Sequence, residues 1–277
     1  MNLTKTFIKA SKYAALVILA IFAMLPMSWM LLTSIRPPEE HFLSPPTFLV
    51  KKPVLDHYLK IFSDIRFVNY FTNSALVAVL TAIVTLLIAS LAGYGFSRLR
   101  FRSKELLFLS IITCQLIPLM VIIFPIYEMF SQLNLLDNVV ALVIPYLILT
   151  IPFSTWMSRA VLSSIPRELE EAAMLDGCTT LGALFRIVFP IAAPGLAAIV
   201  VFCFIEAWNE YLLALTFLSS VEKRTIQIGI FLFKGEYFTD WGALMAASTL
   251  ATIPMIILFI LIQKYFIMGM AGGIKGS

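Results

Sequence analysis

The sequence predicts an all-α, polytopic membrane protein with six transmembrane helices, from its composition, its long uncharged runs and the placement of its basic residues. Of its 277 residues, 60% are hydrophobic and 13% are charged, and the mean hydropathy is +0.95. An ordinary soluble domain has about a quarter charged residues. It could not hide this much apolar side chain, because its surface is already about half apolar or more. The composition excludes a soluble enzyme, a disordered chain and a nucleic-acid-binding protein.

Six runs are nearly free of charge, and each approaches the roughly 20 residues that a helix needs to cross the hydrocarbon core. Backbone polar groups in lipid must bond within their own segment, so we expect helices. The first run is longer than the apolar core of a signal peptide, which favours a span. The expected spans lie near residues 13–35, 70–96, 106–127, 138–158, 191–215 and 241–263. Prolines within the runs predict kinks or breaks: they are Pro118, Pro125, Pro145, Pro152 and Pro254.

Six spans would put both termini on one side of the membrane. That side would hold residues 1–12, 98–105, 159–190 and 264–277. The densest basic cluster, Arg98 to Lys104, falls there, whereas the short segment 129–137 on the other side has no Lys or Arg. The excess of basic residues in cytoplasmic loops makes the first side cytoplasmic. Residues 36–66 then form a proline-rich outer loop.

No catalytic or metal site is expected on this chain. Its three cysteines are Cys114, Cys178 and Cys203, an odd and widely spaced set with no CxxC pair. Two histidines, His41 and His57, are too few for a His-based metal site. The chain also lacks a G-x-x-x-x-G-K-[S/T] phosphate loop. If transport uses ATP, the hydrolysis must take place on another chain.

The cytoplasmic loop 159–190 predicts a short helix outside the lipid. Ser163 or Ser164 could cap it, and Pro166 suits its first turn. The glutamates from 168 to 171 favour the positive end of the helix dipole. Gly177 lies where a left-handed residue would end the helix, and Thr179 or Thr180 could start a second helix.

Two interpretations of this helix remain open from its residues. Ala172 and Ala173 leave a narrow surface, Leu169, Met174 and Leu175 supply apolar contact, and the glutamates suit a basic partner protein. Alternatively, the helix lies on lipid headgroups, although such helices usually carry Lys and Arg on the polar face.

The loop resembles the conserved motif of ABC importer permeases, which reads Glu-Ala-Ala, three residues, Gly, nine residues, Ile-x-Leu-Pro. This chain has Glu171-Ala172-Ala173, then Gly177, then Ile187 to Pro190, with Phe189 in place of Leu. Other segments resemble the carbohydrate-uptake branch of that family: 73–102, 166–177, 208–211 and 263–276. The resemblance covers about residues 10–277 and favours the shorter, six-span member of the permease pair.

The resemblance implies the type I ABC importer permease fold, with a coupling helix that docks on a cytoplasmic ATPase. The residues it assigns to coupling are Glu170, Glu171, Ala172, Ala173, Asp176, Gly177, Ile187 and Pro190. Glu171 would pair with a basic residue of the ATPase, and Gly177 would permit the turn. The implied partners are a second, homologous permease subunit in a heterodimer, two ATPase subunits that bind ATP and Mg, an extracytoplasmic solute-binding protein and a sugar. The implied location is the inner membrane of a prokaryote.

Polar residues near the fifth span are candidates for the solute pathway. Glu206 and Glu210 are four residues apart, which would place them on one helix face near the outer end. They could border a vestibule with Asn209, where Trp208 stacks on a sugar, or they could cap and pair locally at the interface. Asn73 and Gln115 are similar candidates, for which a helix–helix hydrogen bond is the alternative.

The rival functions are a secondary, ion-coupled transporter and a membrane-embedded enzyme. The first should carry functional acids near the mid-membrane and inverted-repeat symmetry, and one acid pair supports it poorly. The second needs a nucleophile–base or metal constellation, which the predicted spans lack. The sequence does not name the sugar.

Overall fold

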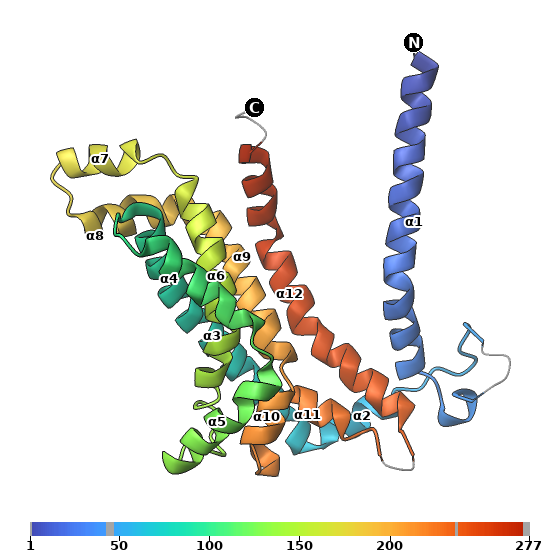
Figure 1. The fold of residues 1–277 in the computed structure, drawn as a ribbon. Helices are drawn as coiled ribbons and strands as arrows, with labels where there is room; N and C mark the ends of the chain where they lie inside the picture. Colours follow the sequence, from blue (N-terminus) through green and yellow to red (C-terminus); the bar gives the residue numbers. More distant parts are fainter. Residues whose placement is uncertain (1, 43–46, 236–237, 274–277) are drawn as a thin grey trace. The chain divides into compact units, whose positions relative to one another are not determined.

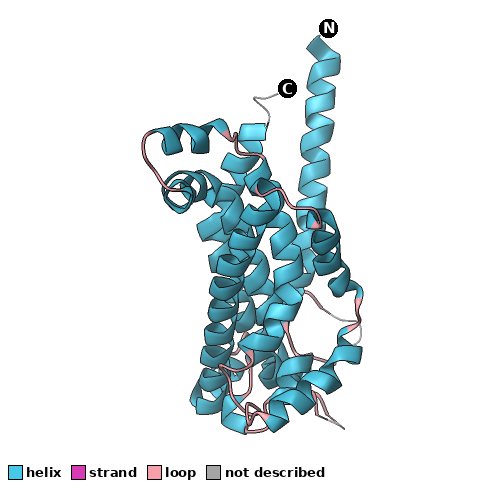
Figure 2. Ribbon diagram, turned by 60° about the vertical axis from the view of Figure 1, so that its left-hand side comes forward, coloured by secondary structure: helices cyan, strands magenta, loops and turns pink. Residues whose placement is uncertain are grey.

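Helices make up nearly all of the structure, a computed structural model that describes residues 2–42, 47–235 and 238–273 (Figure 1; Figure 2). Those residues contain no β-strand, only one isolated antiparallel bridge between Lys234 and Thr239. The all-α fold is therefore confirmed. The long helices are α1 (Asn2–Ser34), α3 (Ile65–Arg98), α6 (Val143–Ser163), α9 (Phe189–Asn209) and α12 (Trp241–Gly273). The shorter ones are α2 (Asp56–Ser63), α4 (Lys104–Thr113), α5 (Leu119–Gln132), α7 (Glu168–Leu175), α8 (Thr180–Ala183), α10 (Leu212–Phe217) and α11 (Ile226–Phe231).

Within the described part of the chain, four helices are long and apolar enough to cross a membrane. They are Lys9–Ser34, Ile65–Arg98, Thr180–Asn209 and Trp241–Lys264. A fifth span would require the pair Lys104–Leu116 and Leu119–Gln132, which is bent by 96°. The predicted span at 138–158 corresponds to α6, which carries several buried hydroxyl side chains and is not among the four. The count of six stays a prediction.

Two of the predicted spans are broken helices. The run 106–127 is interrupted at Ile117 and Pro118, whose backbones are extended (ψ 120° and 133°), because a residue before proline avoids the helical region. The run 191–215 is interrupted at Glu210, with ψ 129°. Prolines at 125, 152 and 254 lie inside helices instead. The predicted cytoplasmic ends are helical too: α1 begins at Asn2, and α12 continues to Gly273, beyond which 274–277 lie outside the described residues.

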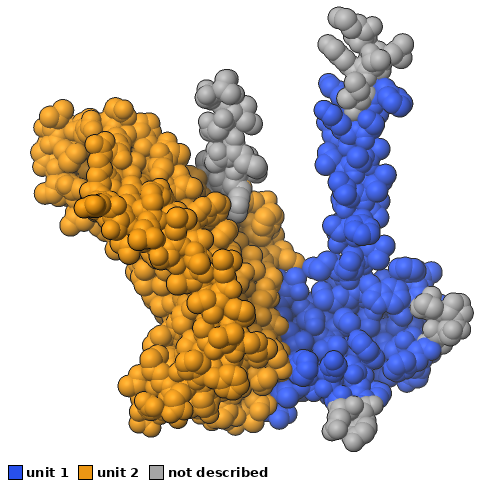
Figure 3. All heavy atoms as spheres, in the orientation of Figure 1, with its two compact units in different colours: residues 1–67, 229–253 blue, residues 68–228, 254–277 orange. Residues whose placement is uncertain are grey.

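The chain divides into two compact units, residues 1–67 with 229–253, and residues 68–228 with 254–277 (Figure 3). In the second unit, α6 packs along α9. Polar side chains join its helices: Thr85 bonds Thr150 at 2.7 Å, and Ser154 bonds Cys203 at 3.2 Å. Such hydrogen bonds between helices add to packing where no water is present.

Glycines allow close helix approach in the second unit. A Cβ atom built on Gly93 of α3 would lie 2.5 Å from the Ser158 hydroxyl oxygen and 2.8 Å from the Arg159 backbone nitrogen of α6. A Cβ on Gly195 of α9 would lie 2.6 Å from Val161. Both α3 and α9 therefore meet α6 through glycine contacts, as small residues do between membrane helices.

The first unit is held by polar contacts near α2. Ser34 bonds the Tyr58 hydroxyl at 2.7 Å, and the His57 ring nitrogen lies 3.0 Å from the Arg36 carbonyl oxygen. Lys60 pairs with Asp240 at 2.8 Å, just before α12. These bonds order the predicted outer loop 36–66 over the residues described.

Candidate functional site

The loop 159–190 folds into a pair of short helices at one end of the second unit, where Figure 1 labels them α7 and α8. The expected cap at Ser163 or Ser164 is wrong, because α6 continues through Ser163 and the N-cap of α7 is Arg167. After α8, a π-helical turn (Leu184–Val188) leads directly into α9.

Gly177 ends α7 in the left-handed conformation, with φ 90°. The Cys178 backbone N–H donates to the Ala173 carbonyl at 3.0 Å, and the Gly177 N–H donates to that of Met174 at 3.1 Å. This pair of bonds is a Schellman motif, which favours glycine. Thr179 then caps α8 by accepting a 3.0 Å hydrogen bond from the Gly182 N–H. Both sequence predictions are confirmed.

The predicted coupling residues divide between two faces of α7. Glu170 and Ala173 are buried, at 6% and 8% exposure, whereas Glu171, Ala172, Asp176 and Gly177 are exposed. Leu175 is 89% exposed beside them. We call this exposed set, residues 171, 172 and 175–177, the free face of α7. Ile187 is half-buried in the π-helical turn, and Pro190 is exposed in the first turn of α9.

Glu170 ties α7 to the end of α3. The Arg98 Nε donates to its Oε1 at 2.5 Å, and the Tyr94 hydroxyl donates to its Oε2 at 2.9 Å. The two charged side chains are 9% and 8% exposed. Arg98 also donates to the Ile165 carbonyl at 2.9 Å, and Arg167 donates to that of Ser97 at 3.1 Å. We call the Tyr94, Arg98 and Glu170 contacts the α3–α7 anchor.

Only part of the α3–α7 anchor could be anticipated from the sequence. Arg98 belongs to the basic cluster that set the predicted orientation, and its burial could not be read from that role. Tyr94 lies between Gly93 and Gly95, a pattern that does not indicate a bond to Glu170. Opposite charge at the end of one apolar run and in the loop 159–190 is the one signal for a contact, and it does not single out Glu170 among Glu168, Glu170 and Glu171.

Glu210 caps a helix in the structure rather than sharing a face with Glu206. Its carboxylate accepts hydrogen bonds from the backbone N–H groups of Leu213 (2.7 Å) and Ala214 (3.0 Å) and from the Tyr146 hydroxyl (2.8 Å). Glu206 is exposed, whereas Glu210 is 9% exposed. The expectation of one common face is wrong, because α9 ends at Asn209 and Glu210 is extended. Local capping, the alternative interpretation, describes Glu210.

Trp208 is a core residue, with 1% of its surface exposed. Its ring meets Phe71 edge-on, with centroids 5.3 Å apart, and stacks on Phe204 at 5.5 Å. Asn209 is exposed, and the Gln227 side-chain amide donates to the Trp208 carbonyl at 3.2 Å. In this structure, the indole face is covered by protein.

The other two pathway candidates belong to different elements. Asn73 is half-buried in α3, and its amide donates to the carbonyl oxygens of Glu222 (2.9 Å) and Arg224 (3.1 Å). Gln115 is exposed in the 3₁₀ turn at the break between α4 and α5.

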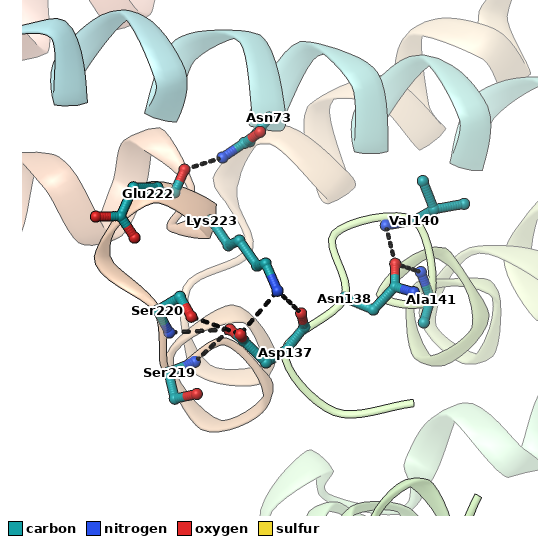
Figure 4. A network of polar contacts seen from close by, with 9 residues as sticks. All are labelled: Asn73, Asp137, Asn138, Val140, Ala141, Ser219, Ser220, Glu222 and Lys223. Atoms are coloured by element: carbon teal, nitrogen blue, oxygen red, sulfur yellow. Dashed lines mark hydrogen bonds and ion pairs between the residues drawn. The ribbon is translucent and has the colours of Figure 1, made fainter. Parts of the chain in front are cut away.

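A cluster that the sequence did not predict joins two loops on the predicted outer side, around Asp137 (Figure 4). Its carboxylate accepts from the backbone N–H groups of Ser219 (3.1 Å) and Ser220 (2.9 Å) and pairs with Lys223 at 2.9 Å. Hydrogen bonds from Lys223 and the Ser220 hydroxyl hold the pKa of Asp137 well below its ordinary value. Asp137 has φ 53°, a strained backbone that the surrounding bonds maintain.

Comparison with known proteins places this geometry in a family. Residues 85–271 match the family described as "Binding-protein-dependent transport system inner membrane component". The chain is 38% identical to the sulfoquinovosyl glycerol transport system permease protein SmoH of Agrobacterium fabrum, covering 97% of this chain and 94% of that one. It is 34% identical to the trehalose/maltose transport system permease protein MalG of Thermococcus litoralis, covering 94% and 95%.

A solved structure shares the fold. It is a chain of a bacterial ABC transporter involved in the import of the acidic polysaccharide alginate, with a TM-score of 0.77 at 24% identity, over 95% of this chain and 98% of that one. From the match over residues 85–271 and from the identity to full-length relatives, the chain belongs to the binding-protein-dependent transport system inner membrane components, the ABC importer permeases.

Proposed function

We propose that this chain is one of two permease subunits of an importer that carries a sugar into the cell, driven by ATP hydrolysis on separate subunits. The relatives support a sugar as the solute, since their names assign them sulfoquinovosyl glycerol and trehalose or maltose. The coupling residues and the ATPase partner follow from the family motif in the loop, and the solute-binding protein follows from the family's description as binding-protein-dependent.

The observation that carries the proposal is the division of α7 into two faces. Glu170 and Ala173 are buried against the rest of the second unit, while the acidic and apolar groups of the free face meet solvent. A helix that only covered its own protein would not need exposed Glu171, Asp176 and Leu175 at its end. An ATPase groove with basic residues would complement this face.

The α3–α7 anchor supplies a route for force. A push on α7 passes through the buried Arg98–Glu170 pair to the end of α3, a helix that continues to Ile65. Motion passes between distant sites through packed side chains and rigid helices that can adopt two arrangements. Closing of the ATPases would therefore move α3 as a rigid helix. The close glycine contacts of α3 and α9 with α6 would carry that motion to the neighbouring helices.

In the solute pathway, the exposed groups Glu206 and Asn209 are the candidates for direct contact with sugar hydroxyls. Trp208 and Glu210 are buried and hold the chain between α9 and α10 in place. A second permease subunit would complete the pathway, and an extracytoplasmic binding protein would deliver the sugar to the side of the Asp137 cluster. In this arrangement, both termini and α7 are cytoplasmic, in the inner membrane of a prokaryote.

Purification and uptake together test the proposal. Extracted in a mild detergent, the tagged chain should bring down a second permease and two ATPase subunits. In proteoliposomes with the binding protein, uptake of a panel of labelled saccharides should require ATP and survive collapse of the ion gradients. Uptake that stops with the gradient and ignores ATP would instead establish a secondary transporter.

A further inference from the structure

The turn between α3 and α4 carries three cations that the protein leaves unpaired. Within the described ranges, no ion pair or hydrogen bond involves the side chains of Arg100, Arg102 or Lys104. The two neighbouring acids are already occupied, because Glu170 is bonded by Arg98, and Glu105 is bonded by Arg159 at 2.7 and 2.9 Å. Glu105 also lies at this turn, but its carboxylate is bonded by Arg159, and the three cations outnumber it.

These cations surround an open cavity. It has a volume of about 530 Å³ and is lined by residues 99–102 and 104–106, among which Glu105 is the one acid and is bonded by Arg159. The start of α4 adds backbone donors, since Ser103 at its N-cap makes no cap hydrogen bond. Uncapped N–H groups and the positive end of the helix dipole favour an anion. The cationic side chains and the first turn of α4 therefore border the same open hollow.

Apolar side chains alternate with the cations. Leu99 is 55% exposed, Phe101 is 42% exposed and Leu106 is 70% exposed. A soluble anion would make no contact with these apolar side chains. An acidic protein surface would place charged groups against them. An amphiphile can contact both sets of side chains, because its anionic head pairs with the cations and its acyl tail packs on the apolar groups.

The turn also lies where a lipid headgroup would be. One candidate span ends at Arg98, and the next helix of a candidate span begins at Lys104. Residues between two such helix ends lie at the depth of the membrane interface. Basic clusters beside membrane helices attract anionic lipids.

We propose that residues 99–106 form a binding site for the phosphate group of an anionic phospholipid, with Arg100, Arg102 and Lys104 as its ligands. The exposed Leu99, Phe101 and Leu106 contact the acyl region of that lipid. Arg98 is excluded from the site by its bond to Glu170.

Lipid titration of the purified complex tests the site. Phosphatidylglycerol and phosphatidylcholine are titrated separately, and bound lipid is counted by native mass spectrometry. Wild type should bind phosphatidylglycerol at least about tenfold more tightly than phosphatidylcholine, and R100Q/R102Q/K104Q should lose that preference. The charge-conserving R100K/R102K should retain most of it. The matched control K51Q/K52Q/K234Q, which removes three exposed cations elsewhere, should leave it unchanged.

Three results would overturn the proposal. Equal retention of phosphatidylglycerol by wild type and R100Q/R102Q/K104Q would show that these three side chains do not bind the lipid phosphate. Displacement of the lipid by millimolar inorganic phosphate would make this a site for a soluble anion. Loss of the ATPase subunits from R100Q/R102Q/K104Q with lipid binding intact would assign the surface to a protein partner. The lipid measurement does not depend on transport, so it stands even if the proposed function fails.

Discussion

The Glu210 carboxylate accepts a 2.8 Å hydrogen bond from the Tyr146 hydroxyl, and through it the break after α9 is fixed to α6. The same carboxylate binds the first N–H groups of α10. The Glu210 carboxylate thus joins α6 and α10 at the residue where α9 ends and the fifth apolar run is broken.

Removing this carboxylate should destabilise the protein. Glu210→Ala leaves the buried Tyr146 hydroxyl and two backbone N–H groups without acceptors, which should cost about 1–3 kcal/mol. The melting temperature in detergent, followed by fluorescence-detected size exclusion, should fall. Glu206→Ala is the matched control, because that side chain is exposed and should change stability by no more than about 0.5 kcal/mol. Equal shifts in the two variants would contradict the capping role.

Breaking the α3–α7 anchor should uncouple transport from ATP hydrolysis. Glu170→Gln leaves Arg98 buried without its counter-charge, a change that typically costs about 3–5 kcal/mol. Uptake per ATP hydrolysed should fall in proteoliposomes. Glu105→Gln is the matched control: it breaks a pair with Arg159 in which Glu105 is 63% exposed, so the uptake-to-ATP ratio should stay close to that of the wild type. An unchanged uptake-to-ATP ratio in Glu170→Gln would show that the α3–α7 anchor does not transmit the motion of the ATPases.

Substitutions at Gly177 should act through the backbone. Its φ of 90° is unfavourable for side chains with a Cβ atom, although no atom lies within 4 Å of the position that the Cβ would take. We expect Gly177→Val to lose ATP-driven uptake, Gly177→Ala to lose part of it at a cost of about 1–2 kcal/mol, and Gly177→Asn to keep most of it. The chain should remain in the membrane in each case. Wild-type uptake by Gly177→Val would show that the turn is dispensable.

Trp208 should matter for stability rather than for sugar affinity. Its buried ring contacts Phe71 and Phe204, so Trp208→Ala should cost about 3–5 kcal/mol. Trp208→Phe should recover much of that loss with an unchanged half-saturation concentration for uptake. A stable Trp208→Ala protein with a raised half-saturation concentration would restore the sugar-stacking interpretation.

The Asp137 cluster should loosen only in acid. Because the folded-state pKa is depressed, its stabilisation is present above the unfolded value of about 3.9 and is lost as pH falls through the folded pKa. Hydrogen exchange at the amides of Ser219 and Ser220 should therefore be independent of this group from about pH 5 to 8, after correction for intrinsic rates. Asp137→Asn should speed that exchange at neutral pH. Protection lost already near pH 6 would contradict the assignment.

The apolar runs and the loop motif predicted most of the helices and the end of α7, because those features depend on residues close together in the sequence. A run of uncharged residues must form a helix in lipid, and Gly177 ends α7 as its position in the motif indicated. The break at Pro118 is local too, because the residue before a proline avoids the helical region. The break at Glu210 depends on Tyr146 of another helix, and α6 carries hydroxyls whose partners, such as Cys203, are distant in sequence. The Arg98–Glu170 pair was missed for the same reason, since charge alone does not tell which acid a base will meet.

The most direct test of the central claim is photo-crosslinking from the free face of α7 in the intact membrane. A photoreactive residue replaces Leu175, which is 89% exposed, and Phe124 of α5, which is 78% exposed, serves as the control position. We predict that position 175 crosslinks to an ATP-binding subunit, that position 124 does not, and that the yield from 175 changes when ATP is added. Crosslinks from 175 to lipid alone, with or without ATP, would contradict the account.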